Sequence, residues 1–351
     1  MATPEFLRTL LTTPGPSGYE TPVAKVWREA AAAFADVSAD TVGSSVARVS
    51  GTAGGPLTAV IGHIDEIGVI VTHIDDDGFL RFEGVGGWDP IILVGQRVTL
   101  STKDGEIDGV IGKKPIHLMK PDDRKNVPEL KDLHIDIGAK DGDDARARVR
   151  VGDVAVIAGE PVELPNDRVV SRAMDNRLGA FVAFEAARLV AEAGGAPGDV
   201  AAVAAVQEET NLVGSRTSVF SLQPDVAIVV DVTFATDQPG VQLGELSRQP
   251  FGSGPSITRG SMVHPVVTEL LIETAEAESI PYTLSAAGRA TGTDADAVHL
   301  TRGGIPTAVV SIPLRYMHSP VEMVQLGDVH ATAKLIAAFA QRVSADTSFL
   351  R

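Results

Sequence analysis

Side chains that bind metal ions follow four apolar stretches of the chain. The stretches and the residues behind them are 57–62 with His63 and Asp65, 200–206 with Glu208 and Glu209, 226–230 with Asp231, and 307–312 with His318. Continuous apolar runs of this length are typical of strands buried on both faces of a sheet. Ligands of open α/β sheets bind beyond the carboxyl ends of the strands, so we expect these residues to converge on one crevice. Asp175, at the start of a predicted helix over 176–193, can face the same crevice.

This set contains two His, two Asp and one Glu as candidate ligands, with a second Glu beside them. Two divalent ions need a bridging carboxylate and a few nitrogen or oxygen ligands each, with positions left open for water and substrate. Asp65 stands two residues after His63, where its carboxylate can hold the second imidazole nitrogen. Glu208 and Glu209 are adjacent at a predicted strand end, so their side chains should diverge. One of the two glutamates can bind metal while the other takes a proton from a bridging water.

Each part of this pattern has a simpler explanation when it is taken alone. A His-x-Asp sequence is usually a surface pair, adjacent glutamates are usually solvated, and an aspartate after a strand is often a cap. The six other histidines are expected to be structural or superficial: His73, His117, His134, His264, His299 and His330. The stretch 291–295 could shape the pocket or cap a helix, and we favour the pocket. A dinuclear metal site is predicted because the candidate ligands occur together at the ends of predicted elements in a chain whose strands and helices alternate.

The composition excludes several other kinds of site and partner. No cysteine occurs in the 351 residues, which rules out disulfides and thiolate ligands. A net charge of −16 argues against binding to nucleic acid or to an anionic membrane. No G-x-S-x-G motif marks a serine nucleophile. No apolar run is long enough for a membrane span and no secretory pattern opens the chain, so we expect a cytoplasmic protein.

The predicted elements describe an α/β fold with an inserted β-rich segment. Residues 4–36 are predicted as two helices around a Pro- and Gly-rich break at 14–20, with Thr21 as N-cap and the second helix reaching Phe34. Between 68 and 165, short β-prone runs separated by turns predict a small β-barrel or sandwich, with 120–140 as an exposed charged loop. Helices are predicted at 176–193, 265–278 and 326–344. We therefore expect residues 1–67 and 166–351 to form one α/β domain and 68–165 an inserted domain.

Nine stretches spread over nearly the whole chain carry a family resemblance. They are 15–20, 62–68, 86–89, 114–118, 174–177, 207–209, 231–235, 292–295 and 318–324. With these motifs the chain resembles the tetrahedral (TET) aminopeptidases, metallopeptidase family forty-two, which includes glutamyl aminopeptidases and proteins labelled endoglucanase M. The last stretch, His318-Ser-Pro-Val-Glu-Met-Val324, is highly specific because it occurs in order after the others.

The resemblance implies a role for each candidate residue. The implied metal ligands are His63 and Asp231 on one ion, Glu209 and His318 on the other, and Asp175 as the bridge. Glu208 is implied to be the general base, and Asp65 the partner that orients His63. Two divalent ions per subunit are expected, zinc first, with cobalt or manganese as alternatives.

The resemblance also implies a mixed-sheet, phosphorylase/hydrolase-like α/β metallopeptidase domain with an inserted β-barrel that pairs subunits. Peptides are the expected substrates, cleaved after their N-terminal residue, and dimers are expected to assemble into a dodecamer. At Thr210-Asn211-Leu212 the family more often has Val-Gly-Leu, which leaves the ligands intact but should alter the adjoining pocket. The preferred N-terminal residue therefore stays open.

The sequence leaves three alternatives open. A deacylase or another peptidase could share the fold and the ligands. An endoglucanase is disfavoured, because glycosidases use two carboxyl groups flanking a sugar and no histidine-containing metal centre. A scaffold without enzymatic activity is disfavoured by the complete ligand set and base.

Overall fold

An eight-stranded mixed sheet forms the centre of the protein in the computed structural model, which describes residues 2–244 and 246–351. The strand order is β1-β2-β12-β3-β13-β16-β14-β15. The strands are β1 Asp36–Ala39, β2 Ser45–Val49, β3 Gly55–His63, β12 Gly198–Ala205, β13 Val226–Phe234, β14 Ser256–Gly260, β15 Thr283–Ala287 and β16 Thr307–Leu314. The four central strands, β12, β3, β13 and β16, are mutually parallel, so their carboxyl ends lie at one edge of the sheet.

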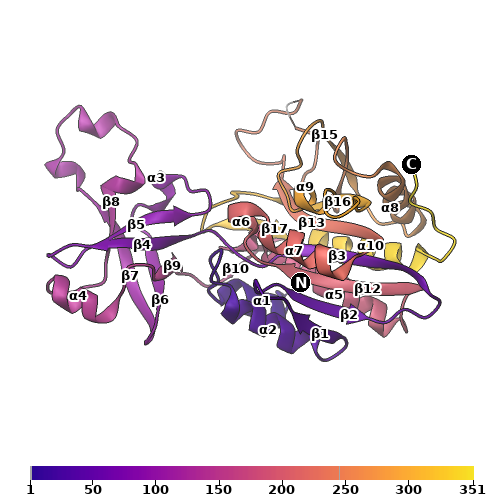
Figure 1. Ribbon diagram of the computed structural model, residues 1–351. Helices are drawn as coiled ribbons and strands as arrows, with labels where there is room; N and C mark the ends of the chain where they lie inside the picture. Colours follow the sequence, from indigo (N-terminus) through magenta and orange to yellow (C-terminus); the bar gives the residue numbers. More distant parts are fainter. Residues whose placement is uncertain (1, 245) are drawn as a thin grey trace.

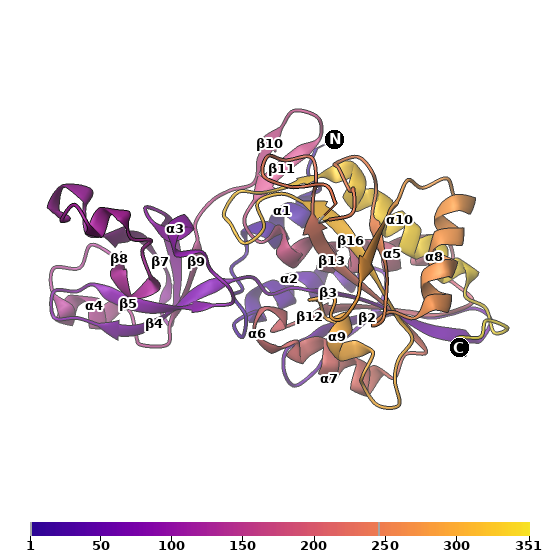
Figure 2. The same ribbon diagram turned by 90° about the horizontal axis from the view of Figure 1, so that it is seen from above.

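Helices cover both faces of this sheet (Figure 2). On one face lie α1 Glu5–Thr12, α2 Thr21–Ala31, α5 Met174–Glu192, α8 Pro265–Ala277 and α10 Leu326–Arg342; α7 Val213–Leu222 and α9 Ala295–Val298 lie on the other. Alternate residues of β3 enter different cores: Val60 packs with the α5 side, and Ala59 and Ile61 pack with the α7 side. This two-sided burial is the reason why the central strands read as continuous apolar runs.

A closed six-stranded barrel stands beside the α/β part, at the left of Figure 1. Its order is β4-β5-β8-β7-β6-β9, and every pairing is antiparallel. The barrel strands are β4 Gly68–Ile74, β5 Leu80–Val85, β6 Arg97–Thr102, β7 Gly105–Lys113, β8 Leu133–Asp136 and β9 Val154–Ile157, with the short helices α3 Pro90–Leu93 and α4 Gly142–Arg148 between them. The barrel has a hydrophobic core of its own. The predicted fold class, a mixed-sheet α/β fold with an inserted β-barrel, is confirmed.

A small three-stranded sheet follows the barrel. It contains β10 Val162–Leu164, β11 Arg168–Ser171 and β17 Glu322–Gln325, in that order. β10 thus falls within the range 68–165 but pairs with β11. The division into residues 1–67 with 166–351, and 68–165, stays a prediction.

Several predicted elements differ from the structure. The charged segment 120–140 is not all loop, because it includes β8, whose Leu133 and Ile135 point into the barrel core. The second helix ends at Ala31 instead of Phe34, and Thr21 is its first helical residue, with Glu20 at the N-cap position. Packing against the barrel core, which local composition does not record, places β8 within the charged segment 120–140. No helix in the described part of the chain is both long enough and apolar enough to span a membrane.

Two further differences concern candidate site residues. Glu208 and Glu209 do not end a strand; they begin the short helix α6 Glu208–Asn211, which two intervening residues separate from the end of β12. Asp231 does not follow its strand either, because β13 continues to Phe234. The helical turn, and not strand alternation, therefore separates the directions of the two glutamate side chains.

Candidate metal centre

The predicted ligands come together at the carboxyl edge of the central strands. His63 is the last residue of β3, Asp231 lies in the neighbouring strand β13, and Asp175 lies at the start of α5. Glu209 is on α6, the helix that follows β12 in the chain, and His318 is on the loop between β16 and β17. Five segments that are distant in the sequence thus contribute to one cluster, in which His63, Asp175 and Asp231 are buried and His318 is partly exposed.

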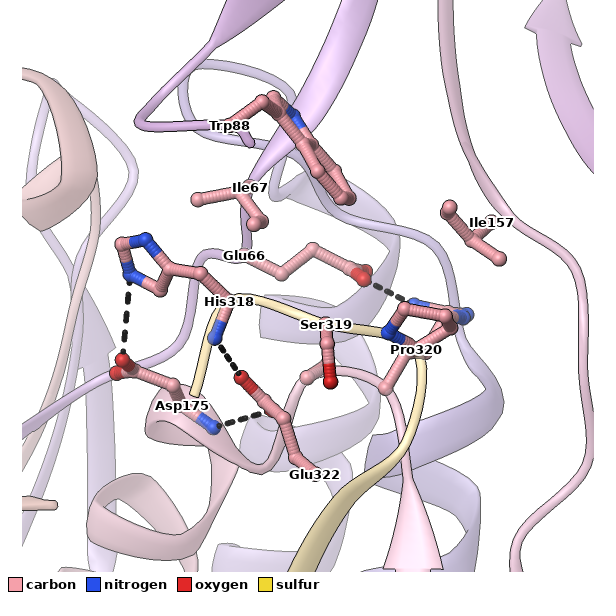
Figure 3. Close-up of a pocket in the computed structure, with 11 residues that line it drawn as sticks. Glu66, Ile67, Trp88, Ile157, Asp175, His318, Ser319, Pro320 and Glu322 are labelled. Atoms are coloured by element: carbon pink, nitrogen blue, oxygen red, sulfur yellow. Dashed lines mark hydrogen bonds and ion pairs between the residues drawn. The ribbon is translucent and has the colours of Figure 1, made fainter. Parts of the chain in front are cut away.

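Asp175 lies between the two histidines. Its Oδ1 is 3.3 Å from Nε2 of His63. Its Oδ2 is 3.4 Å from Nε2 of His318, the contact drawn in Figure 3. Glu209 Oε1 is 3.5 Å from the same nitrogen of His318, and Glu208 Oε2 is 3.7 Å from Nε2 of His63. The two imidazoles therefore contact different oxygens of the Asp175 carboxylate.

Two overlapping groups of side chains have the spacing of a metal site. His63, Glu208 and Asp231 offer ligand atoms that all lie within 4.8 Å of one another, and so do His63, Asp175 and Glu209. His63 belongs to both groups. Glu208 therefore occupies a ligand-like place next to Asp231, although the family resemblance implies that it is the general base.

Asp65 connects the first histidine to the glutamates. Its side chain is fully buried, and its Oδ1 lies 3.3 Å from Nδ1 of His63. The backbone N–H of Glu208 donates to Asp65 Oδ1 and that of Glu209 to Oδ2, each over 3.1 Å. A carboxylate beside Nδ1 favours the ring orientation in which Nε2 faces the cluster, which is the usual orientation of a metal-binding histidine.

The cluster has an excess of buried carboxylates. In the described parts of the chain, no Lys or Arg forms an ion pair with Asp175, Glu208, Glu209 or Asp231. Burial, reinforced by the charge of Asp231, raises the pKa of Glu208 to about 9. Burial likewise holds the pKa of Asp231 well above its ordinary value. Without a cation, the Glu208 carboxyl keeps its proton at neutral pH.

For His318 and Asp175, in contrast, the pKa shifts favour the charged forms. Hydrogen bonds to Asp175 and Glu209 raise the pKa of His318 to about 11. Burial opposes ionisation of Asp175, but the two imidazoles outweigh it and hold the pKa of this carboxyl far below its usual range. A divalent cation replaces such protons and stabilises the ionised carboxylates. The donor set, nitrogen and oxygen only, therefore fits one or two divalent metal ions.

Glu322 is a buried carboxylate whose role the sequence does not reveal. Its Oε1 accepts a hydrogen bond from the backbone N–H of His318 over 2.8 Å, and its Oε2 accepts one from that of Asp175 over 3.1 Å (Figure 3). The side chain is only 2% exposed. Glu322 thus ties together the backbones of two candidate ligands. It belongs to the motif 318–324, but no spacing rule points to this contact.

Asp294, in the stretch 291–295, lies near the same cluster. It is 1% exposed, and its Oδ1 accepts a 2.5 Å hydrogen bond from Ser215 Oγ. Burial raises the pKa of Asp294 to about 6, and the charge of Asp65 acts in the same direction. The pocket role predicted for the stretch 291–295 stays a prediction.

Comparison with known proteins defines the family. The family model of the M42 glutamyl aminopeptidases matches residues 43–335, and the chain belongs to this family of peptidases. A lysyl aminopeptidase of Pyrococcus furiosus is 34% identical over 97% of both chains. The crystal structure of a TET aminopeptidase from the marine sediment archaeon Thaumarchaeota archaeon SCGC AB-539-E09 superposes with a TM-score of 0.91, at 35% identity, over 97% of this chain and 96% of that one. The TET1 peptidase of Pyrococcus horikoshii, which can assemble into a tetrahedron or a large octahedral shell, has a TM-score of 0.84 at 31% identity, over 96% and 99% of the two chains. The predicted resemblance is confirmed.

Proposed function

We propose that this protein is a dinuclear-metal aminopeptidase that removes N-terminal residues from peptides. The observation that carries the proposal is the position of Asp175, whose two oxygens face two different imidazoles. A carboxylate placed in this way suits a bridge between two cations. Membership in the M42 family supports the peptidase class.

We assign each cation two further ligands. His63 and Asp231 would hold one ion, and His318 and Glu209 the other, with Asp175 shared between them. Zinc is the first candidate, and cobalt or manganese also suits nitrogen and oxygen ligands. When bound, such ions lower the pKa of water and polarise the scissile carbonyl.

The remaining residues move the proton and hold the geometry. Glu208 would take the proton of the attacking water and return it to the leaving amine. Its buried carboxyl, with a raised pKa, is suited to keeping a proton between those two steps. Asp65 would orient His63 through Nδ1, and it also anchors the backbone of Glu208. The free α-amino group of the peptide would lie against a metal ion or a carboxylate of the site, which restricts cleavage to the N-terminus.

The decisive experiment combines chelation with a substrate panel. Dialysis against a chelator should abolish the hydrolysis of aminoacyl chromogenic substrates, and zinc, cobalt or manganese should restore it. Matched N-acetylated substrates separate an aminopeptidase from a deacylase, and a soluble cellulose substrate tests the endoglucanase alternative. Full peptidase activity in a preparation with verified absence of metal would refute the proposal.

We also propose a homo-oligomer in which the inserted barrel pairs subunits and dimers build a dodecamer. Support comes from solved relatives at 30% identity or more, one of them described as a dodecamer. A cytoplasmic location and the absence of nucleic-acid and membrane partners stay predictions that rest on composition.

A further inference from the structure

The loop between α1 and α2 reaches the turn that carries Glu208 and Glu209. Two buried side chains of this loop make the contact, Ser17 at 5% and Glu20 at 4% exposure. Glu20 Oε1 accepts hydrogen bonds from the backbone N–H of Gly18 over 2.6 Å and from that of Gln207 over 3.0 Å. The hydroxyl groups of Ser17 and Thr210 are 3.1 Å apart. The loop therefore holds this turn at both ends.

The turn requires such support. Gln207 has a φ of 58°, a left-handed conformation that side-chain-bearing residues adopt rarely, and it directly precedes Glu208. The first N–H groups of a helix have no partner within the helix. Here three successive amides, at positions 207, 208 and 209, each donate to a buried carboxylate: the first to Glu20 and the other two to Asp65. The direction of both glutamate side chains thus depends on acceptors outside the turn.

The loop itself is fixed to the residue next to Asp65. Glu66 N–H donates to Gly15 O over 3.2 Å, and Ser17 N–H donates to Glu66 O over 3.1 Å. The carboxylate of Glu66 forms buried ion pairs with Arg172 and Arg177, and Arg177 also donates to Thr13 O over 3.0 Å. A Cβ added at Gly15 would lie 2.7 Å from Val23 Cγ1, so the loop is tightly packed. The loop and Asp65 therefore form one rigid frame around the turn.

We propose that the loop 14–20 is a positioning clamp for Glu208 and Glu209. Glu20 is its main positioning residue, and the hydroxyl pair of Ser17 and Thr210 is its second contact. The inference rests on the proposed function, in which Glu208 and Glu209 take part in hydrolysis.

The first test compares two substitutions of Glu20. Glu20→Leu removes the acceptor of the Gln207 N–H, whereas Glu20→Gln keeps an amide oxygen in its place. We expect Glu20→Leu to lower kcat about tenfold or more with KM changed less than about threefold, and Glu20→Gln to recover most of the loss. Competition with a chromogenic chelator should show zinc held about tenfold more weakly in Glu20→Leu, as is usual when a supporting residue of a metal site is lost. Glu29→Gln, an exposed change on α2, should match the parent protein in both measurements.

The second test does not depend on the folding of Glu20→Leu. Ser17→Ala, Thr210→Val and the double variant form a cycle, and each single change should lower kcat about two- to threefold. The double variant should lose no more than either single variant, because one shared contact is removed. Independent, multiplicative losses would overturn the second contact.

The outcomes separate the clamp from the proposed function. The clamp is overturned if folded Glu20→Leu keeps the parent kcat and zinc retention while Glu208→Gln is inactive. It is also overturned if Glu20→Gln is as impaired as Glu20→Leu, since hydrogen-bond acceptance would then not be the role. A fully active Glu208→Gln would overturn both the proposed function and the clamp.

Discussion

Replacing each of the two adjacent glutamates by glutamine should have different consequences. Glu208→Gln keeps the size of the side chain and removes the proton acceptor, so both metal ions should remain bound while catalysis fails. Glu209→Gln weakens a ligand that lies 3.5 Å from Nε2 of His318, so metal content should fall from two ions toward one. The pair therefore tests the assignment of base and ligand in a single experiment.

The size of the Glu208→Gln effect follows from its neighbours. General base catalysis contributes about 10²- to 10⁴-fold, which is about 2.7–5.4 kcal/mol at about 1.36 kcal/mol per tenfold. The nearby carboxylates Asp65 and Asp175 are unable to accept the proton of the water instead. Asp65 already accepts hydrogen bonds from two backbone N–H groups, and Asp175 faces two imidazoles. We therefore expect kcat to fall at least about 100-fold, with little change in KM.

The assay combines steady-state kinetics on an aminoacyl chromogenic substrate with metal analysis after gel filtration. Glu278→Gln, an exposed change just after α8, is the matched control and should leave both readouts unchanged. The reverse pattern, with metal lost from Glu208→Gln and retained in Glu209→Gln, would refute our assignment. Glu208 would then be the ligand, in agreement with its place beside His63 and Asp231.

Three more predictions concern support, pH and assembly. Glu322→Ala should weaken metal retention about 10- to 100-fold, because it frees the backbones of Asp175 and His318; unchanged retention in chelator competition would contradict this. In metal-free protein, folding raises the pKa of Glu208 to about 9 and that of His318 to about 11. The folded state therefore binds more protons than the unfolded state between about pH 6.5 and 9. The free energy of unfolding should fall as the pH rises through this range. Thermal unfolding of chelator-treated protein checks this sign, and a melting temperature that rises with pH would show it to be wrong. Light scattering should find twelve chains of 36.6 kDa, about 440 kDa in closed symmetry, and a stable, active monomer would refute the assembly.

Much of the fold was accessible from local patterns. The central strands are continuous apolar runs because both of their faces are covered, and the barrel strands are short runs separated by turns. The candidate ligands could be selected because metal-binding residue types follow continuous apolar runs at the edge where ligands of α/β sheets bind. The element bounds were less accessible: β8 lies within a charged segment, and its assignment depends on Leu133 and Ile135 meeting the barrel core.

The sequence by itself therefore determined the family, the fold class and the types of residue that could bind metal. Only the tertiary structure decided which atoms meet. Asp175 faces both imidazoles, Glu322 reaches the backbone of Asp175 across 147 positions of the chain, and Glu20 reaches Gln207 over 187 positions. These contacts join residues far apart in the chain, and they depend on local backbone dihedral angles such as the positive φ of Gln207. Residue spacing does not reveal these long-range contacts or backbone angles, because both arise only when separate elements pack together.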